Sequence, residues 1–383
     1  MLFTLGVLIY APYIAIFLKY HGIPDKFFNF PAISAGSDKP DHNPVVSVTA
    51  SVLFIAVMLL LIFPRIFGFK KAAPTVLKAS KAKVRFPFWF WLGAVSSVGT
   101  VIFLFFHLSK PAWLNEWALI PLWWGFIYML DALVYYRNGG VSLASNAPTE
   151  LISMAVLSIS GWLIFEYFNF FIRLNWYYPF ANLISHDKFL LYAVAGSSAF
   201  IPMAFEWYQL LRTFPSLNVK YKFGPKVRFS KGVRIGLLIL SVVGMIASSY
   251  HPNNLFYVVW LAPLTILTIV LGFLGIWTPF ISIRDSGDWS SLLIFAPAFL
   301  IQGVFLECAN YLSAEHLPSG IKSSNPGFWE YCIPYVKSWR IFEMPLLGYL
   351  GYIPFSIYCW IWFISMAFLM NISTSFSLNE DYM

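Results

Sequence analysis

The sequence predicts an all-α protein, a polytopic transmembrane bundle of about ten helical spans. Of the 383 residues, 59% are hydrophobic and only 11% are charged, whereas soluble domains contain about 25% charged residues. Apolar stretches of about 20 residues, the length that crosses a ~30 Å hydrocarbon layer as a helix, recur along the whole chain. These observations exclude an ordinary water-soluble enzyme of two domains.

The first span is the N-terminal stretch. No Lys or Arg precedes it and no small-residue cleavage site follows it, so we interpret it as a retained helix rather than a signal peptide. The whole chain, 1–383, then forms a single transmembrane domain. The predicted spans cover residues 1–18, 45–69, 87–107, 117–137, 151–172, 189–211, 233–250, 255–282, 291–312 and 341–372.

Two basic loops orient these spans. Residues 70–85 and residues 212–234 are both rich in Lys and Arg, which gather in cytoplasmic loops. Four predicted spans separate the two loops, so both lie on the cytoplasmic side of what we expect to be a bacterial inner membrane. Both termini are then cytoplasmic as well. Beyond setting topology, such loops can also contact anionic lipids or a protein partner.

An internal repeat is predicted from three pieces that recur in the same order. Phe126-Ile127 with Asp131 matches Phe280-Ile281 with Asp285; Glu166 with Asn169 matches Glu307 with Asn310; and Trp176-Tyr177-Tyr178-Pro179 matches the segment from Trp329 to Pro334. We interpret them as a parallel duplication of a three-span unit, spans 4–6 and 8–10. The chain then divides into an N-terminal three-span unit (1–107), a first repeat (108–232), and a linking span with the second repeat (233–383).

The two Glu-x-x-Asn pairs predict a functional site. Residues three apart share one helix face, and both pairs fall near the outer ends of their spans. If the repeats face each other, their carboxyls converge, and mutual repulsion out of water favours a protonated acid that can donate or relay a proton. The predicted catalytic residues are Glu166, Glu307 and Glu343; the predicted substrate-binding residues are Asn169, Asn310, Trp176, Tyr178, Trp329 and Tyr331. The alternative is that Glu and Asn bond across helices and only hold the bundle together.

The last span supplies Glu343 and is unusual. It is too long for one ordinary crossing, and Pro345, Gly348, Gly351 and Pro354 interrupt its first half. We expect a broken helix, in which a short or re-entrant piece precedes a crossing that starts at about Ile353. Broken backbone at membrane depth persists only where protein or a cavity covers it. The alternative is a bent lead-in that lies in the outer interface.

A second group of acids lies near the inner ends of the spans. It consists of Asp131, Glu206 and Asp285, each with an arginine close by in the sequence: Arg137, Arg212 and Arg284 respectively. Ion pairing explains this secondary cluster better than a functional site does.

No cofactor, metal or nucleic acid is predicted. The six histidines fall in outer loops or at outer ends and lack the spacing of a zinc site. The three cysteines, Cys308, Cys332 and Cys359, are too scattered for a disulfide framework. Aromatic residues make up 20% of the chain, which exceeds what two interfacial belts need, so many rings must lie inside the bundle.

Several of these residues carry a resemblance. Pro148-Thr149-Glu150 before span 5 and Phe165-Glu166 within it resemble the integral-membrane lycopene cyclase family over spans 4–10. That family has a second acid after Pro-x-Glu, where this chain has Leu151, and the second half has no Pro-x-Glu copy. Trp123-Trp124-Gly125 with Asp131, and the segment from Phe342 to Gly351, resemble bacterial multi-pass proteins of no assigned activity that carry a FEMPLLGYLG-like segment.

Two classes of function follow. In the first, a membrane lipid or isoprenoid enters an outer-leaflet acidic and aromatic site, a protonated carboxyl starts chemistry, and aromatic faces stabilise a cationic intermediate. In the second, the protein is a non-catalytic subunit of a membrane complex or a proton-coupled transporter. Its carboxyls would then couple protons or hold the bundle.

Overall fold

The chain is mostly helical in its computed structural model, which describes residues 1–35, 42–71, 84–106, 108, 110–336 and 339–374. Within these residues, nine helices are long and apolar enough to cross a membrane when His186–Arg212 and Leu346–Met370 are each taken as one helix, and the sixteen-residue Val258–Phe273 is a shorter apolar helix. The predicted all-α class is therefore confirmed, and the helices are those of a multi-pass membrane protein.

Most helices follow the predicted spans closely, but the predicted span 255–282 is divided into two helices, Val258–Phe273 and Pro279–Asp285. In the first half they are α1 (Leu2–Tyr20), α2 (Pro44–Ile62), α3 (Phe88–Phe105), α4 (Ala112–Trp117), α5 (Leu119–Arg137), α6 (Leu143–Asn146), α7 (Pro148–Phe171), α8 (His186–Ser197) and α9 (Phe200–Arg212). In the second half they are α10 (Pro215–Lys220), α11 (Lys231–Tyr250), α12 (Val258–Phe273), α13 (Pro279–Asp285), α14 (Ser290–Leu312) and α15 (Tyr352–Met370).

Short 3₁₀ turns and strands fill the connections. The turns are η1 (Asp25–Phe28), η2 (Pro64–Phe67), η3 (Ala181–Leu183) and η4 (Leu346–Gly351). The strands form three antiparallel pairs: β1 (Trp176–Tyr177) with β4 (Glu330–Tyr331), β2 (Ala314–Leu317) with β3 (Gly320–Ser323), and β5 (Arg340–Ile341) with β6 (Met344–Pro345).

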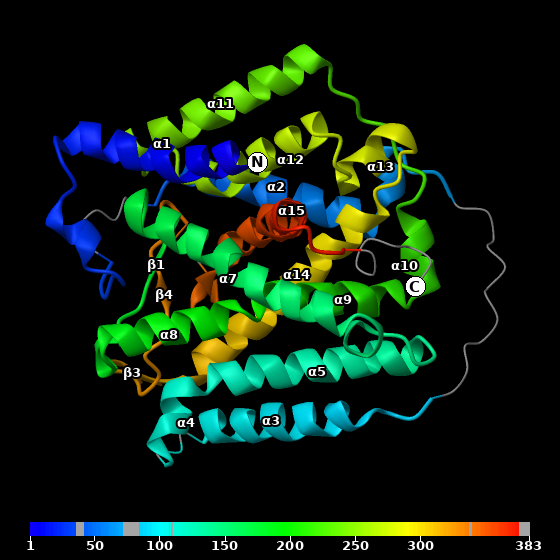
Figure 1. The fold of residues 1–383 in the computed structure, drawn as a ribbon. Helices are drawn as coiled ribbons and strands as arrows, with labels where there is room; N and C mark the ends of the chain where they lie inside the picture. Colours follow the sequence, from blue (N-terminus) through cyan, green and yellow to red (C-terminus); the bar gives the residue numbers. More distant parts are fainter. Residues whose placement is uncertain (36–41, 72–83, 107, 109, 337–338, 375–383) are drawn as a thin grey trace.

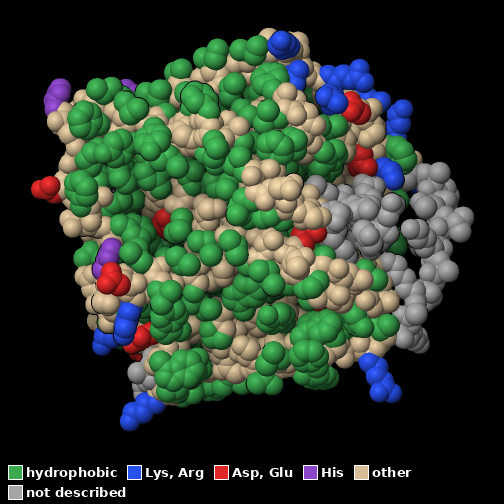
Figure 2. All heavy atoms as spheres, viewed as in Figure 1, with side chains coloured by type: hydrophobic (Ala, Val, Ile, Leu, Met, Phe, Trp, Pro, Cys, Tyr) green, Lys and Arg blue, Asp and Glu red, His purple; other side chains and the backbone are tan. Residues whose placement is uncertain are grey.

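The bundle has two distinct ends. The strands β1, β3 and β4 lie at the left of Figure 1, and α10 and α13 lie at the right; we call these the strand end and the α13 end. Lys and Arg side chains gather next to α13 at the upper right of Figure 2, while hydrophobic side chains cover the middle of the same face. Part of the predicted basic loop, residues 72–83, lies outside the described residues.

Local sequence explains where key helices begin and break. The Asn43 side chain caps α2 by accepting from the backbone N–H groups of Val45 (3.0 Å) and Val46 (3.3 Å), which otherwise lack partners. Pro148 stands at the first position of α7, where its missing N–H has no effect. The predicted span 189–211 is divided into α8 and α9 just before Pro202, because a proline ring clashes with the carbonyl four residues earlier.

The predicted break in the last span is present as a β5–β6 hairpin followed by η4. The continuous helix α15 then starts at Tyr352, one residue before the expected position. The piece before it is a 3₁₀ turn rather than a half-helix.

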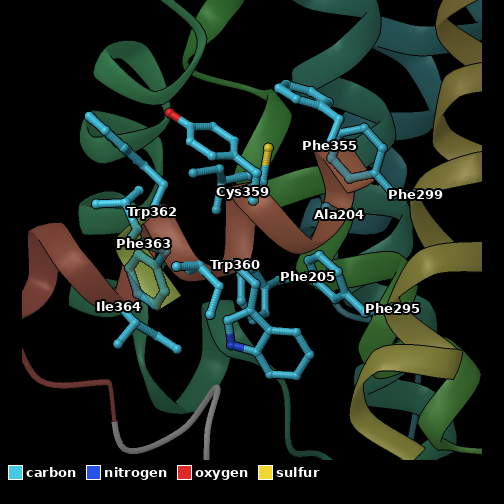
Figure 3. Close-up of a cluster of buried hydrophobic side chains, with 14 of the residues drawn as sticks. Ala204, Phe205, Phe295, Phe299, Phe355, Cys359, Trp360, Trp362, Phe363 and Ile364 are labelled. Carbon is cyan, nitrogen blue, oxygen red and sulfur yellow. The ribbon is translucent and has the colours of Figure 1, made fainter. Parts of the chain in front are cut away.

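Helix α15 occupies the centre of the bundle, surrounded by α7, α9, α12 and α14 (Figure 1). Figure 3 shows its aromatic side chains facing those of α9 and α14. The Trp360 ring centroid lies 5.5 Å from that of Phe205 and 4.7 Å from that of Phe295, and Phe355 lies 5.3 Å from Phe299. Such pairs contribute about 0.5–1.5 kcal/mol each beyond their buried area, so aromatic contacts account for much of the packing.

The N-terminal helices pack on different parts of the bundle. Helix α1 contacts α11, α2 contacts η2 and η4, and α3 lies along α5. Small residues allow the α3–α5 approach: a Cβ atom on Gly93 would lie 2.4 Å from the carbonyl oxygen of Gly125. The main contacts of the predicted N-terminal unit 1–107 are therefore with later helices.

Candidate functional site

Glu166 lies near the strand end of α7, with its carboxyl buried. The Trp176 indole N–H donates to Glu166 Oε1 at 3.1 Å, and the Tyr178 hydroxyl donates to the same oxygen. The other oxygen, Oε2, is buried and has no hydrogen-bond partner among the described residues. Both donors come from β1 and the residue after it, so the loop that follows α7 folds back over the acid.

Glu307 has a closely similar environment on α14. Its Oε1 accepts from the hydroxyls of Tyr331 (2.6 Å) and Tyr352 (2.8 Å). The Trp329 indole N–H donates to the Tyr331 hydroxyl at 3.0 Å. Glu307 Oε2 is buried and likewise lacks a partner in the described part of the chain. In both halves, one carboxyl oxygen holds two aromatic donors and the other holds none.

The two asparagines hold these aromatic residues in place. Asn169 Oδ1 accepts from the backbone N–H of Trp176 (3.3 Å), and its Nδ2 donates to the Trp176 carbonyl (2.9 Å). Asn310 makes the same two bonds with Trp329, at 3.0 and 2.8 Å. Predicted as substrate-binding residues, they use their amides on the backbone and act as positioning residues for the predicted aromatic side chains.

A strand pair joins the two halves. Trp176 lies opposite Tyr331, and Tyr177 lies opposite Glu330. The Tyr177 hydroxyl donates to Glu330 Oε2 at 3.0 Å. Because Trp176 contacts Glu166 and Tyr331 contacts Glu307, this strand pair links the two acids, and each acid keeps its own hydrogen-bond partners.

Glu343 has different partners from the other two predicted acids. It lies in the β5–β6 turn, buried, with Oε1 2.5 Å from His316 Nε2 on β2. Arg340 Nη1 lies 3.8 Å from the other oxygen, and the His316 ring stacks on Tyr311 with centroids 4.0 Å apart. No sequence signal selects His316, because its pairing depends on two hairpins that meet only in the folded chain.

The inner acids separate into two environments. Asp131 and Glu206 are fully buried and interact with each other, and Asp131 also accepts from Trp89 Nε1 (2.9 Å), Ser142 Oγ (2.9 Å) and the Ala144 N–H (2.8 Å). Asp285 is exposed instead.

The ion-pair interpretation holds for only one of these acids. Asp285 Oδ1 lies 2.7 Å from Arg284 Nε, and this contact lowers the pKa of the Asp285 carboxyl. The expected pairs of Asp131 with Arg137 and of Glu206 with Arg212 are wrong. Arg137 donates to Thr213 Oγ1 (2.6 Å) and Arg212 to the Tyr208 hydroxyl (3.0 Å), because both guanidinium groups point to loop and helix-end partners instead of the buried carboxyls.

A cavity of about 880 Å³ opens beside Glu166. Aromatic side chains are the largest class in its wall, and Glu166 is the only Asp, Glu, Lys, Arg or His among the described residues that line it. The volume falls within the ~300–1,000 Å³ typical of small-molecule sites. Of the predicted aromatic residues, Trp176, Tyr178, Trp329 and Tyr331 all line it.

No family model, curated protein or solved structure matches this chain. The function is therefore inferred from the geometry of the site.

Burial, and then the neighbouring Glu166 carboxyl, raise the pKa of Tyr178 well above the ordinary tyrosine value. Burial and the Glu307 carboxyl do the same for the pKa of Tyr331. Both hydroxyls therefore stay protonated at neutral pH and remain hydrogen-bond donors to the two acids.

Metal ligation has no support in the described residues, where no three His, Cys, Asp or Glu side chains gather closely enough to hold an ion.

Sequence reasoning missed several residues that line the cavity, including Trp123, Asn175 and one face of α2. Asn175 directly precedes the predicted Trp176, so its position next to that motif was the available signal.

Proposed function

We propose that this protein is an integral membrane protein of the cytoplasmic membrane with ten spans and both termini inside. Nine long apolar helices, with α12 as the tenth, support the span count. The basic side chains near α13 and on the loop before α11 support a cytoplasmic position for the α13 end. The strand end, and with it Glu166, then lies toward the outer leaflet.

We also propose that the two halves derive from a duplicated three-span unit. The support is a shared set of contacts: an acid that accepts two aromatic donors on one oxygen, and an asparagine three residues later that holds a tryptophan backbone at both its N–H and its carbonyl. The inner acids differ between the halves, since Asp131 is buried and Asp285 is exposed.

For its activity, we propose that the protein binds a membrane lipid or isoprenoid in the aromatic cavity and protonates it with Glu166. One observation carries this proposal: the only ionisable acid or base among the described lining residues, tyrosines aside, has an unpartnered buried oxygen in an apolar, aromatic wall. Because Trp176 and Tyr178 both donate to Oε1, the acidic proton belongs on Oε2.

The chemistry then balances without a co-reactant. The O–H bond at Oε2 breaks, a C–H bond forms at a carbon–carbon double bond, and a carbocation results. The rings of Trp162, Trp176 and Trp260, all in the cavity wall, supply negative π faces that stabilise such a cation. Loss of a proton from the rearranged cation restores the acid. This sequence fits the resemblance to the lycopene cyclase family.

The test is to purify the full chain, extract it with organic solvent and identify the lipids by mass spectrometry. A retained isoprenoid or lipid with double bonds, converted by the wild-type protein but not by Glu166→Gln, supports the proposal. Glu315→Gln, on an exposed strand position, is the matched control and should convert it normally. Full conversion by Glu166→Gln would contradict the proposal, and a tightly co-purifying protein with no bound lipid would favour the non-catalytic subunit.

A further inference from the structure

Two polar groups from the cavity wall lack partners. Glu166 Oε2 and Asn175 Oδ1 are both buried, and neither has a hydrogen-bond partner among the described residues. The side chains of Glu166 and Asn175 are 4% and 1% exposed, and both residues line the cavity. Buried polar atoms without a partner are unfavourable. The cavity is therefore suited to a ligand group that satisfies both atoms.

A hydroxyl group is the match for this pair. It accepts one hydrogen bond through its oxygen, from a protonated Glu166, and donates one through its hydrogen, to the Asn175 carbonyl oxygen. A pure hydrocarbon would leave both atoms unsatisfied. A phosphate or carboxylate would place an anion beside these groups, although no Lys, Arg or His occurs among the described lining residues to neutralise it.

The rest of the cavity fits a long apolar chain. Along α2 the wall consists of Val45, Val46, Thr49, Ala50, Leu53 and Val57, which follow one face of the helix at helical spacing. At a rise of 1.5 Å per residue, the span from Val45 to Val57 is about 18 Å. A second wall comes from α12, through Tyr257, Trp260, Leu261 and Leu264.

Helix α2 packs mainly against η2 and η4 and not against α12, although residues of both helices line the cavity. Leu53 on α2 is 53% exposed, and Leu261 on α12 is 46% exposed, although both line the cavity. These positions lie within apolar helices that we assign to the membrane. The opening between α2 and α12 therefore faces hydrocarbon, where an apolar chain can enter sideways.

We propose that the cavity takes an uncharged long-chain or isoprenoid alcohol, which enters from the bilayer between α2 and α12 and binds with its hydroxyl between Glu166 and Asn175. In the proposed reaction the hydroxyl leaves Glu166 Oε2 before a double bond of the same molecule takes the proton. This inference rests on the proposed function and names its ligand class. The chain lies along α2 with the hydroxyl at the strand end. The ligand's head, not its tail, distinguishes it from the bulk lipid around the protein.

The head group is tested with three probes of equal chain length, hexadecanol, hexadecane and hexadecyl phosphate, added to the purified full chain. Tryptophan fluorescence reports binding, because several tryptophans line the cavity. Two neutral hydrogen bonds predict that hexadecanol binds about tenfold more tightly than the other two. Equal binding of hexadecane, tighter binding of hexadecyl phosphate, or no binding of hexadecanol would overturn the inference.

Variants separate this inference from the proposed chemistry. Glu166→Gln keeps hydrogen bonding, so it should still bind hexadecanol. It should no longer convert the co-purified lipid, because it has no acidic proton. Asn175→Leu should reduce the preference for hexadecanol over hexadecane because one of the two hydrogen bonds is lost, and the wild-type probe series decides the question even if this variant does not fold. A wild-type preference for hexadecanol without any conversion of bound lipid would contradict the proposed function alone.

The side opening is tested by a matched pair of substitutions on α2. Leu53→Trp places a bulky ring in the cavity wall and should slow hexadecanol binding from vesicles at least tenfold. Val52→Trp lies next to it, is 60% exposed and does not line the cavity, so it should leave the rate unchanged. Equal rates for the two variants would refute this route.

Discussion

Gly303 on α14 faces the ring of Tyr352, a residue that both lines the cavity and donates to Glu307. A Cβ atom at Gly303 would lie 2.6, 2.7 and 2.9 Å from three carbon atoms of that ring. Ordinary contact starts at 3.4 Å, so Gly303→Ala requires the ring to move by about 0.8 Å. The hydroxyl bond to Glu307, 2.8 Å long, would then reach the limit of hydrogen bonding.

The expected loss of stability combines two effects. Overpacking a core costs about 1–3 kcal/mol, and a hydrogen bond between membrane helices contributes about 0.6 kcal/mol. Gly303→Ala should therefore lower the free energy of unfolding by about 2–4 kcal/mol. Reversible unfolding by SDS in mixed micelles, followed by tryptophan fluorescence, measures this value.

A double-mutant cycle identifies the cause. In a Tyr352→Leu background the ring is absent, so Gly303→Ala should cost less than about 0.5 kcal/mol. Gly236→Ala in α11, where a new Cβ meets no atom within 4 Å, should instead stabilise by about 0.4–1 kcal/mol. An equal cost of Gly303→Ala in both backgrounds, or a stabilising effect like that of Gly236→Ala, would refute the reasoning.

Two further predictions concern charge and orientation. The pKa of Tyr178 is raised by burial, so the stability it contributes is present below the unfolded value of about 10 and is lost as the pH rises through the folded-state pKa. Melting temperature should fall less steeply at alkaline pH in Tyr178→Phe, and an unchanged slope would contradict this. In a background without native cysteines, Ser319→Cys should react with an impermeant maleimide in intact cells and Ser230→Cys should not; the reverse pattern would invert the proposed topology.

Much of the fold could be predicted because span length and apolar composition are local properties. The helices α5, α7 and α14 begin and end within a few residues of the predicted spans. The Glu-x-x-Asn pattern also indicated the similar settings of the two acids and the two asparagines, since i and i+3 share a helix face. Each asparagine amide bonds to the backbone of the following loop, a contact between segments that leaves no trace in the sequence.

The rest depends on contacts between distant segments. Asn175 and Trp123 line the same cavity because the segment before β1 and helix α5 both border it in the folded chain. No periodicity in the sequence indicates that these two segments come together. Adjacent arginines also misled the interpretation of Asp131, whose donors come from Trp89 and from the Ser142–Ala144 segment instead.

Helix α2 makes few contacts with the rest of the bundle, so its tilt can change. This helix contacts mainly η2 and η4, and only 6% of the residues in its apolar stretch are buried inside the protein. The bilayer is therefore its principal neighbour. A helix adapts to a thicker or thinner bilayer by changing its tilt, and a change in the tilt of α2 alters the width of the gap to α12. We therefore expect bilayer thickness to regulate how readily the cavity exchanges its contents, through lipid composition alone and without a regulatory ligand.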